Sequence, residues 1–144
     1  MNKQFLLACA LFLILLTSCA APQRNYLTST EEIIGVYAST GGATYARFSE
    51  DGTVRFGPSL MLVTHEPLYP PGEYWFEGQQ LHLSSKDDPV CDNFSAVYQV
   101  EKQANGDLWF FAQEDGCDHR LVVLQGILDQ ETGNPSTRWV PVEE

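Results

Sequence analysis

The sequence predicts an all-β fold, a small up-and-down antiparallel β-barrel of about eight strands that follows a cleaved leader. Beyond the first 18 residues, no segment keeps the helical period of apolar residues. Short runs rich in β-branched and aromatic residues follow one another instead, and glycine-containing turn signals separate them. Closing such a meander into a barrel removes its exposed strand edges. A two-sheet sandwich is the alternative.

The start of the chain has the pattern of a secretory signal. A single cation, Lys3, precedes an apolar run of 12 residues, Phe5–Leu16, which is shorter than the roughly 20 residues that cross a bilayer. Small residues then precede a cysteine in Leu16-Thr17-Ser18-Cys19. These four residues resemble the lipobox of bacterial lipoproteins, in which the cysteine is acylated and becomes the new N-terminus. The resemblance implies removal of residues 1–18 and lipidation of Cys19; an ordinary signal peptide is the alternative.

Lipidation would determine where the protein resides. Several acyl chains on one cysteine give stable membrane anchoring. Ala20 rather than an aspartate follows Cys19, which resembles the lipoproteins that Gram-negative bacteria sort to their outer membrane. We therefore expect an extracytoplasmic, lipid-anchored protein, in the outer membrane if the source has one. Residues 19–30 are small and polar and predict a tether, and residues 31–144 predict one barrel domain.

The composition is acidic, with 19 Asp and Glu against 8 Lys and Arg and a net charge of −11. Removing the leader takes away Lys3 and no acid, so the charge becomes −12. A surface of this sign repels nucleic-acid phosphates, and we expect no nucleic-acid partner. It would attract a basic protein.

Two cysteines remain once Cys9 in the leader and Cys19 are set apart. Cys91 and Cys117 belong to a chain bound for an oxidising compartment, and they predict a disulfide. A closed loop of about 26 residues would stabilise the fold by roughly 3–4 kcal/mol in the chain-entropy model.

Three turn signals predict hairpins. Asp51-Gly52, Gly78-Gln79 and Asn105-Gly106 each separate two alternating runs, and glycine accepts the positive φ that tight turns need. The runs are Ile33–Ser39, Ala43–Ser49, Thr53–Phe56, Glu73–Glu77, Gln80–Ser84, Ser95–Glu101, Asp107–Gln113, Arg120–Gln125 and Thr137–Val142. Alternation within the runs predicts one inward face, and it places Trp75 and Trp109 on the outside.

The long connection Gly57–Gly72 stands apart because it contains four prolines. Its apolar centre, residues 60–63, predicts a short helix or strand that covers one end of the fold. Connections of this length are often functional. As a lid over a barrel mouth, it would bring Leu60, Met61, Leu62 and Tyr69 to a ligand; the alternative is that they plug the barrel end as core.

Two motifs resemble lipocalin-like (calycin) barrels, and the resemblance covers about residues 31–142. Gly35-Val36-Tyr37 is similar to the Gly-x-Trp signature that opens those barrels, with tyrosine in place of tryptophan. Arg138-Trp139 resembles the late strand, where that family often places an arginine over the opening aromatic residue. The resemblance implies an eight-stranded barrel with an end-opening cavity for a small apolar ligand. It also implies that Tyr37 pairs with Arg138.

We expect a non-enzymatic binding module for a small apolar or amphipathic ligand. The expected ligand contacts are Tyr37, Leu60, Met61, Leu62, Tyr69, Tyr74, Phe76, Tyr98, Phe110 and Arg138. The chain has no Gly-x-Ser-x-Gly elbow, phosphate-binding glycine loop or His-Glu-x-x-His motif, and we expect no cofactor. We also expect no metal, because the acidic residues near the two cysteines match no calcium-loop spacing. One alternative is a protein-binding envelope lipoprotein, such as an inhibitor of a cell-wall enzyme. Another is an accessory component of an envelope complex.

Overall fold

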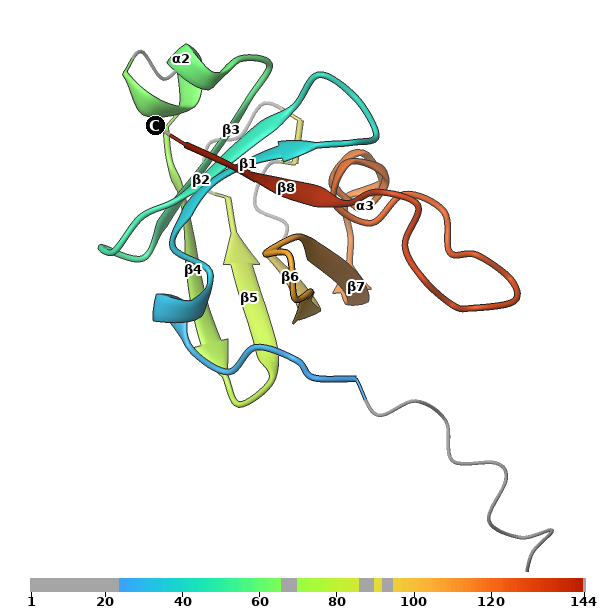
Figure 1. Cartoon of the computed structure of the whole chain (residues 1–144). Coiled ribbons are helices and arrows are strands. Elements are labelled where there is room, and N and C mark those ends of the chain that lie inside the picture. The colour runs from blue at the N-terminus through green and yellow to red at the C-terminus, as the bar shows by residue number, and fades with distance from the viewer. Residues whose placement is uncertain (1–23, 66–69, 86–89, 92–94, 144) are drawn as a thin grey trace, which may run out of the picture.

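The computed structural model describes residues 24–65, 70–85, 90–91 and 95–143, and it shows a closed antiparallel barrel (Figure 1). Each strand pairs with its neighbour in sequence, and β8 pairs back with β1. The predicted up-and-down barrel is therefore confirmed, and the sandwich alternative is wrong. The strands are β1 Gly35–Ser39, β2 Tyr45–Phe48, β3 Thr53–Gly57, β4 Gly72–Glu77, β5 Gln80–Ser84, β6 Ser95–Lys102, β7 Leu108–Asp115 and β8 Trp139–Val142.

Tight turns join the strand pairs for which the sequence predicts hairpins. Gly52, Gly78 and Gly106 have φ values of 77°, 60° and 90°, which side chains other than glycine rarely adopt. The turns that they form lie between β2 and β3, β4 and β5, and β6 and β7. All three are at the same end of the barrel, because consecutive strands run in opposite directions. We call it the closed end.

The 3₁₀ helix η1 (Thr30–Glu32) also lies at the closed end, since it leads directly into β1. Ile33, which follows it, is fully buried in the core. Lys102 at the end of β6 donates from Nζ to the carbonyl oxygen of Glu32 over 2.9 Å. This packing covers the closed end of the barrel. The opposite end, which we call the open end, bears the long connections that follow β3, β5 and β7.

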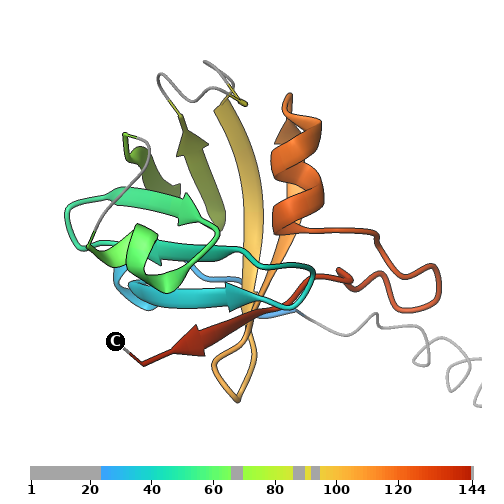
Figure 2. The same cartoon turned by 90° about the horizontal axis from the view of Figure 1, so that it is seen from above.

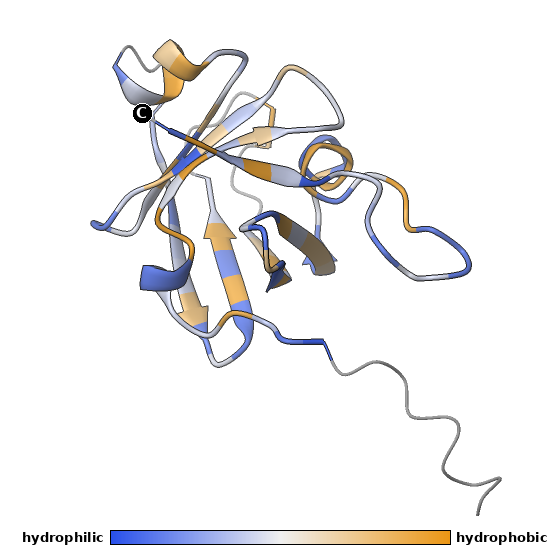
Figure 3. Cartoon of the chain, viewed as in Figure 1, coloured by the Kyte–Doolittle hydropathy of each residue, from blue (hydrophilic) through white to orange (hydrophobic). Residues whose placement is uncertain are grey.

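An interlocked set of aromatic rings fills the middle of the barrel. Phe48 is almost fully buried, and its ring centroid lies 5.1–6.4 Å from those of four others: Tyr37, Phe56, Tyr74 and Phe110. The inward parity predicted for these strands is confirmed, and Figure 3 shows the alternation of apolar and polar residues along β5. Trp75 and Trp109 lie on the outside, as predicted. The interior at this level is packed side chains rather than a channel.

The segment before η1 packs against the barrel wall. The backbone N–H of Leu27 donates to the carbonyl of Val100 over 2.8 Å, and Tyr26 forms a bridge with Glu101. The predicted tether of residues 19–30 is therefore wrong from residue 24 onward. The polar composition of the segment gave no sign of this packing, in which the Tyr26 ring contacts the Phe111 ring and Leu27 belongs to the buried core. Residues 1–23 lie outside the described part of the chain.

The apolar run after Cys117 forms the helix α3 (Asp118–Leu124), whereas its place in the series of runs predicts a strand. Arg120 and Leu124, four residues apart, are buried, and Val122 between them is 66% exposed. That spacing is helical, and a run this short does not distinguish helix from strand by composition. The other helix, α2 (Leu60–Thr64), was predicted as a helix or strand. The two helices lie on opposite sides of the barrel (Figure 2). Among the described residues, no helix combines the length and the apolarity needed to cross a bilayer.

Candidate ligand-binding site

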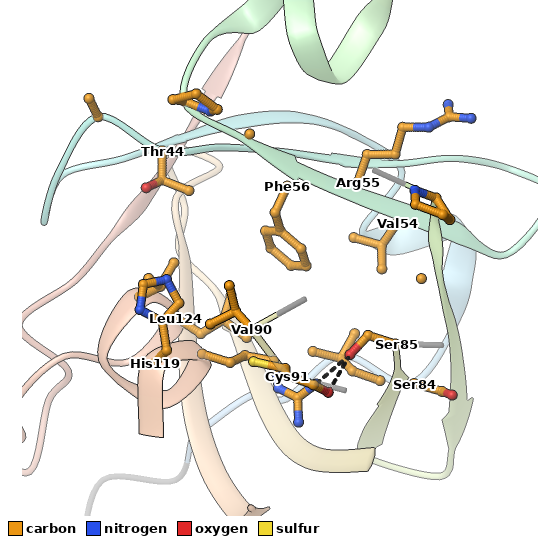
Figure 4. Close-up of a pocket in the computed structure, with 18 residues that line it drawn as sticks. Thr44, Val54, Arg55, Phe56, Ser84, Ser85, Val90, Cys91, His119 and Leu124 are labelled. Carbon is orange, nitrogen blue, oxygen red and sulfur yellow. Dashed lines mark hydrogen bonds between the residues drawn. The ribbon is translucent and has the colours of Figure 1, made fainter. Parts of the chain in front are cut away.

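A cavity of about 270 Å³ lies at the open end of the barrel, above the aromatic core (Figure 4). One wall comes from β3, where Val54 and Phe56 face inward. Figure 4 shows Phe56 pointing toward Val90 and Leu124 across the space, whereas the guanidinium of Arg55 points away. The cavity is therefore lined mainly by apolar side chains from elements far apart in the sequence.

The cavity exists because β3 and β4 separate toward the open end. Their ladder contains only two register pairs, Thr53 with Glu73 and Val54 with Gly72. Phe56 and Gly57 continue past the start of β4, so no β4 residue pairs with them. At the point of separation, a Cβ on Gly72 would lie 2.8 Å from the carbonyl oxygen of Ser84, which leaves room only for glycine. β3 and β4 thus diverge next to a close contact between the backbones of β4 and β5.

The helix α3 forms the opposite wall and contributes His119, Arg120, Val123 and Leu124. Its C-terminal end rests on β8, because the indole Nε1 of Trp139 donates to the carbonyl oxygen of Leu124 over 3.1 Å. Trp139 is fully buried, and its ring lies 6.2 Å from Phe56. The floor of the cavity is therefore continuous with the aromatic core.

A disulfide joins Cys91 to Cys117, as predicted, with the two Cα atoms 5.5 Å apart. Cys117 occupies the N-cap position of α3, and Cys91 belongs to the connection between β5 and β6. The bond therefore attaches the start of α3 to the connection on the other side of the mouth. Val90 and Cys91 line the cavity at this point.

A buried ion pair holds α3 against β7. The Asp115 carboxylate is completely buried and accepts hydrogen bonds from Arg120 Nε and Nη2, at 2.9 and 2.7 Å. The Tyr98 hydroxyl and the Cys117 backbone N–H also donate to it. Nη1 of the guanidinium donates to Ser85 Oγ over 3.2 Å, and both residues line the cavity, where Figure 4 labels Ser85.

These contacts shift the pKa values of the network in opposite directions. Burial by itself would raise the pKa of Asp115, but the hydrogen bonds from Arg120, Tyr98 and Cys117 outweigh it and leave that pKa lowered. Burial and then the contact with Asp115 raise the pKa of the Tyr98 phenol. Asp115 is thus ionised and Tyr98 neutral near pH 7, so each donor meets an acceptor. This part of the site is a rigid support, and the Arg120 charge is already compensated by Asp115.

None of the predicted ligand contacts that the structure describes lines the cavity. Tyr37, Tyr74, Tyr98 and Phe110 belong to the buried core, and Phe76 packs against it. The alternation of side chains along the strands predicted that these residues point inward. It did not predict how deep in the barrel they lie. They occupy the level that the aromatic rings fill, below the cavity. Tyr69 lies outside the described residues.

α2, the described helix of the predicted lid, does not cover the mouth, although Gly57, Pro58 and Pro70 of the same connection line the cavity. α2 contacts β2 and β3 from the outside, and Arg47 on the outer face of β2 donates from Nη1 to the Thr64 carbonyl over 3.2 Å. Val63 is the buried residue of α2, and Met61 is 54% exposed. Leu60, Met61 and Leu62 are therefore parts of an outer buttress, so both the lid and the plug predicted for them are wrong.

The predicted pairing of Tyr37 with Arg138 is also wrong. Tyr37 faces the barrel interior, whereas Arg138 precedes the inward Trp139 by one residue and faces the outside. The Arg138 guanidinium is half exposed and contacts Asp107 at 3.3 Å. The aromatic residue of that motif, Trp139, is the one that enters the core.

The residues that line the cavity include several that the sequence placed on the inward face without assigning them to a site, such as Val54, Phe56 and Leu83. Phe56 and Leu83 each lie one residue before the end of a strand that leads into a long connection, and this position could have identified them; Val54, next to the Gly52 turn, had no such signal. His119 and Val123 were not predicted, because α3 was not recognised as a helix.

No family model, curated protein or solved structure matches this chain. The fold and the cavity are therefore the observations from which its function can be argued. Among the described residues, no three His, Cys, Asp or Glu side chains gather as a metal site would require.

Proposed function

We propose that this protein is a lipid-anchored binding module that holds a small apolar or amphipathic molecule in the open-end cavity. The observation that carries the proposal is the cavity itself, about 270 Å³ with walls of mainly apolar side chains. Pockets for drug-sized ligands commonly enclose about 300–1,000 Å³. The filled core below allows no deeper insertion, so the ligand is small or inserts only one apolar end.

The distribution of polar groups supports an amphipathic ligand. Ser84 and Ser85 follow one another where β5 ends, and the exposed His119 lies on α3. Thr44, the residue before β2, also lines the cavity. A molecule with its apolar part between Phe56 and Leu124 could therefore form hydrogen bonds with its polar end at the rim. Small-molecule sites typically combine apolar walls with a small number of polar groups that point toward the ligand.

Replacing Val123 by tryptophan is expected to fill the cavity and abolish binding. The matched control is Val122→Trp, because Val122 is the adjacent α3 residue, exposed and outside the cavity lining. Titration with the uncharged fluorescent probe N-phenyl-1-naphthylamine measures the affinity of the soluble domain. We expect Val123→Trp to weaken binding at least about tenfold, equivalent to 1.4 kcal/mol, and Val122→Trp to bind like the wild type. Circular dichroism verifies that both variants fold. Equal affinities of the two folded variants for the probe would show that the cavity is not the binding site.

Replacing Cys19 by alanine is expected to release the protein from membranes, because the acceptor of the acyl chains is lost. Cys9→Ala is the matched control, since Cys9 lies in the segment predicted to be cleaved. Fractionation of cells that express each variant gives the readout, and only Cys9→Ala should remain in the membrane fraction. Membrane retention of Cys19→Ala would disprove the lipobox interpretation.

A further inference from the structure

The N-terminal segment is fixed to the barrel beside residues 125–138, the connection between α3 and β8, which we call the excursion. Arg24 donates from Nη1 to Glu101 Oε2 over 2.8 Å, and from Nη2 to Asn134 Oδ1 over 2.8 Å. Nη2 also lies 3.3 Å from the Thr132 carbonyl oxygen, and the guanidinium is 4.4 Å from the centroid of the Phe111 ring. The chain therefore reaches the barrel wall at residue 24, next to this excursion.

The distance from that point to Cys19 is short in sequence. Residues 20–23 are the only ones between them. A fully extended chain covers at most about 3.6 Å per residue, which limits the Cα separation of Cys19 and Arg24 to about 18 Å. If Cys19 carries lipid, the excursion beside Arg24 is held at the bilayer surface, whatever path the intervening residues take.

The same excursion exposes two consecutive apolar side chains. Ile127 is 80% and Leu128 44% exposed, and Ile127 is the most exposed large apolar side chain in the described part of the chain. Hydrogen bonds hold the excursion in shape: Ser136 N–H donates to the Ile127 carbonyl over 2.8 Å, and Asp129 N–H donates to the Asn134 carbonyl over 2.8 Å. The apolar pair is thus supported in an exposed position by an ordered backbone.

We infer that Ile127 and Leu128 form a membrane-docking surface that enters the interface of the bilayer to which Cys19 anchors the chain. The inference rests on the acylation of Cys19 proposed above. A lipid surface is the occupant that the tether length selects, because it brings this excursion, and not the opposite side of the barrel, to the bilayer. Apolar side chains that project from a surface next to a lipid anchor add a second membrane contact to that of the acyl chains.

The charges around the apolar pair determine which lipids suit it. The Asp129 carboxylate accepts hydrogen bonds from the Thr132 backbone N–H and hydroxyl, at 2.7 and 2.8 Å, and backbone and side-chain hydrogen bonds from Thr132 lower its pKa. Glu131 adds a second, exposed negative charge. Anionic headgroups repel both carboxylates. Docking should therefore be deeper on zwitterionic than on anionic bilayers.

The test uses the acylated protein, from which residues 1–18 with Cys9 have been removed, in vesicles of phosphatidylcholine. Ile127→Cys is labelled with an environment-sensitive nitrobenzoxadiazole dye, and Met61→Cys is the matched control. Met61 is also apolar and exposed, but it belongs to α2, which lies away from the excursion on the other side of the barrel (Figures 1 and 2). Acylation occupies the Cys19 sulfur and the disulfide occupies Cys91 and Cys117, so the introduced thiol reacts alone. Nitroxide-labelled phospholipids report the proximity of the dye to the bilayer, and vesicle flotation reports anchoring.

We expect lipid nitroxides to quench the dye at position 127 several-fold more strongly than at position 61, and we expect added phosphatidylglycerol to reduce the difference. Equal, weak quenching of both dyes in a protein that floats with the vesicles would overturn the docking surface while leaving the anchor intact. Loss of flotation would overturn the anchor and the docking surface together, and it would leave the cavity proposal standing. Thermal unfolding of both labelled proteins confirms that the fold is retained.

Discussion

Replacing Phe48 by alanine should lower the free energy of unfolding by about 3–5 kcal/mol, the range typical of large aromatic residues removed from a protein core. Phe48 is 1% exposed. Its ring lies edge-on to Tyr37, Phe56 and Tyr74 and stacked on Phe110. Because these rings are held by four different strands, they cannot all move inward to fill the space that alanine leaves. The barrel loses both the burial of the ring and the contacts around the new void.

Urea unfolding of the soluble domain measures the effect, and Met61→Ala is the control. Met61 is an apolar residue of α2 that is more than half exposed, so its truncation should change stability by no more than about 0.5 kcal/mol. A Phe48→Ala variant as stable as Met61→Ala would contradict a packed interior. It would indicate instead that the middle of the barrel is loosely filled.

Replacing Asp115 by asparagine should cost a similar amount, about 3–5 kcal/mol, because it leaves the charge of Arg120 buried without its partner. The side chain of Arg120 is 8% exposed, and that of Asp115 is fully buried. The variant also weakens the hydrogen bonds that fix the start of α3 and the Tyr98 hydroxyl. Glu77→Gln is the control, since Glu77 forms its contact with His82 at the surface, where ion pairs contribute about 0–1 kcal/mol.

The pH dependence of stability gives an independent measurement of the same pair. The pKa of Asp115 is lower in the folded protein than the value of about 3.9 in an unfolded chain. Its contribution is therefore fully present above that value and is lost as the pH falls through the folded pKa. The unfolding free energies of the wild type and Asp115→Asn should converge at acidic pH. A constant difference between them down to strongly acidic pH would show that the ionised pair is not the origin of the effect.

The alternation of side chains was enough to predict the strands and their inward faces. Phe48, Val54 and Tyr98 lie inside, as their positions in the runs indicate, because the two-residue period of a strand is a local property. The turns at Gly52, Gly78 and Gly106 were predictable for the same reason, since a positive φ favours glycine.

The site was not predictable in the same way, because the depth of a residue in the barrel depends on contacts between distant strands. Tyr74 and Phe56 both face inward, yet Tyr74 lies in the core and Phe56 lines the cavity. That difference follows from where β3 and β4 diverge, which no local pattern specifies. The helix α3 was missed because its apolar run is too short for composition to distinguish a helix from a strand. Its orientation depends on the Cys91–Cys117 bond and the Asp115–Arg120 pair.

Native mass spectrometry of the protein, purified gently from the cells that make it and trimmed of the proposed acyl anchor, tests the binding-module proposal most directly. We expect a reproducible additional mass that is lost on denaturation, is absent from Val123→Trp and is retained by Val122→Trp. The size of the cavity requires that mass to correspond to a small molecule, or to one whose polar end projects from the mouth. A bare domain mass for the wild type, together with no binding of the naphthylamine probe, would contradict a small-molecule function. Such a result would direct attention to a basic protein partner.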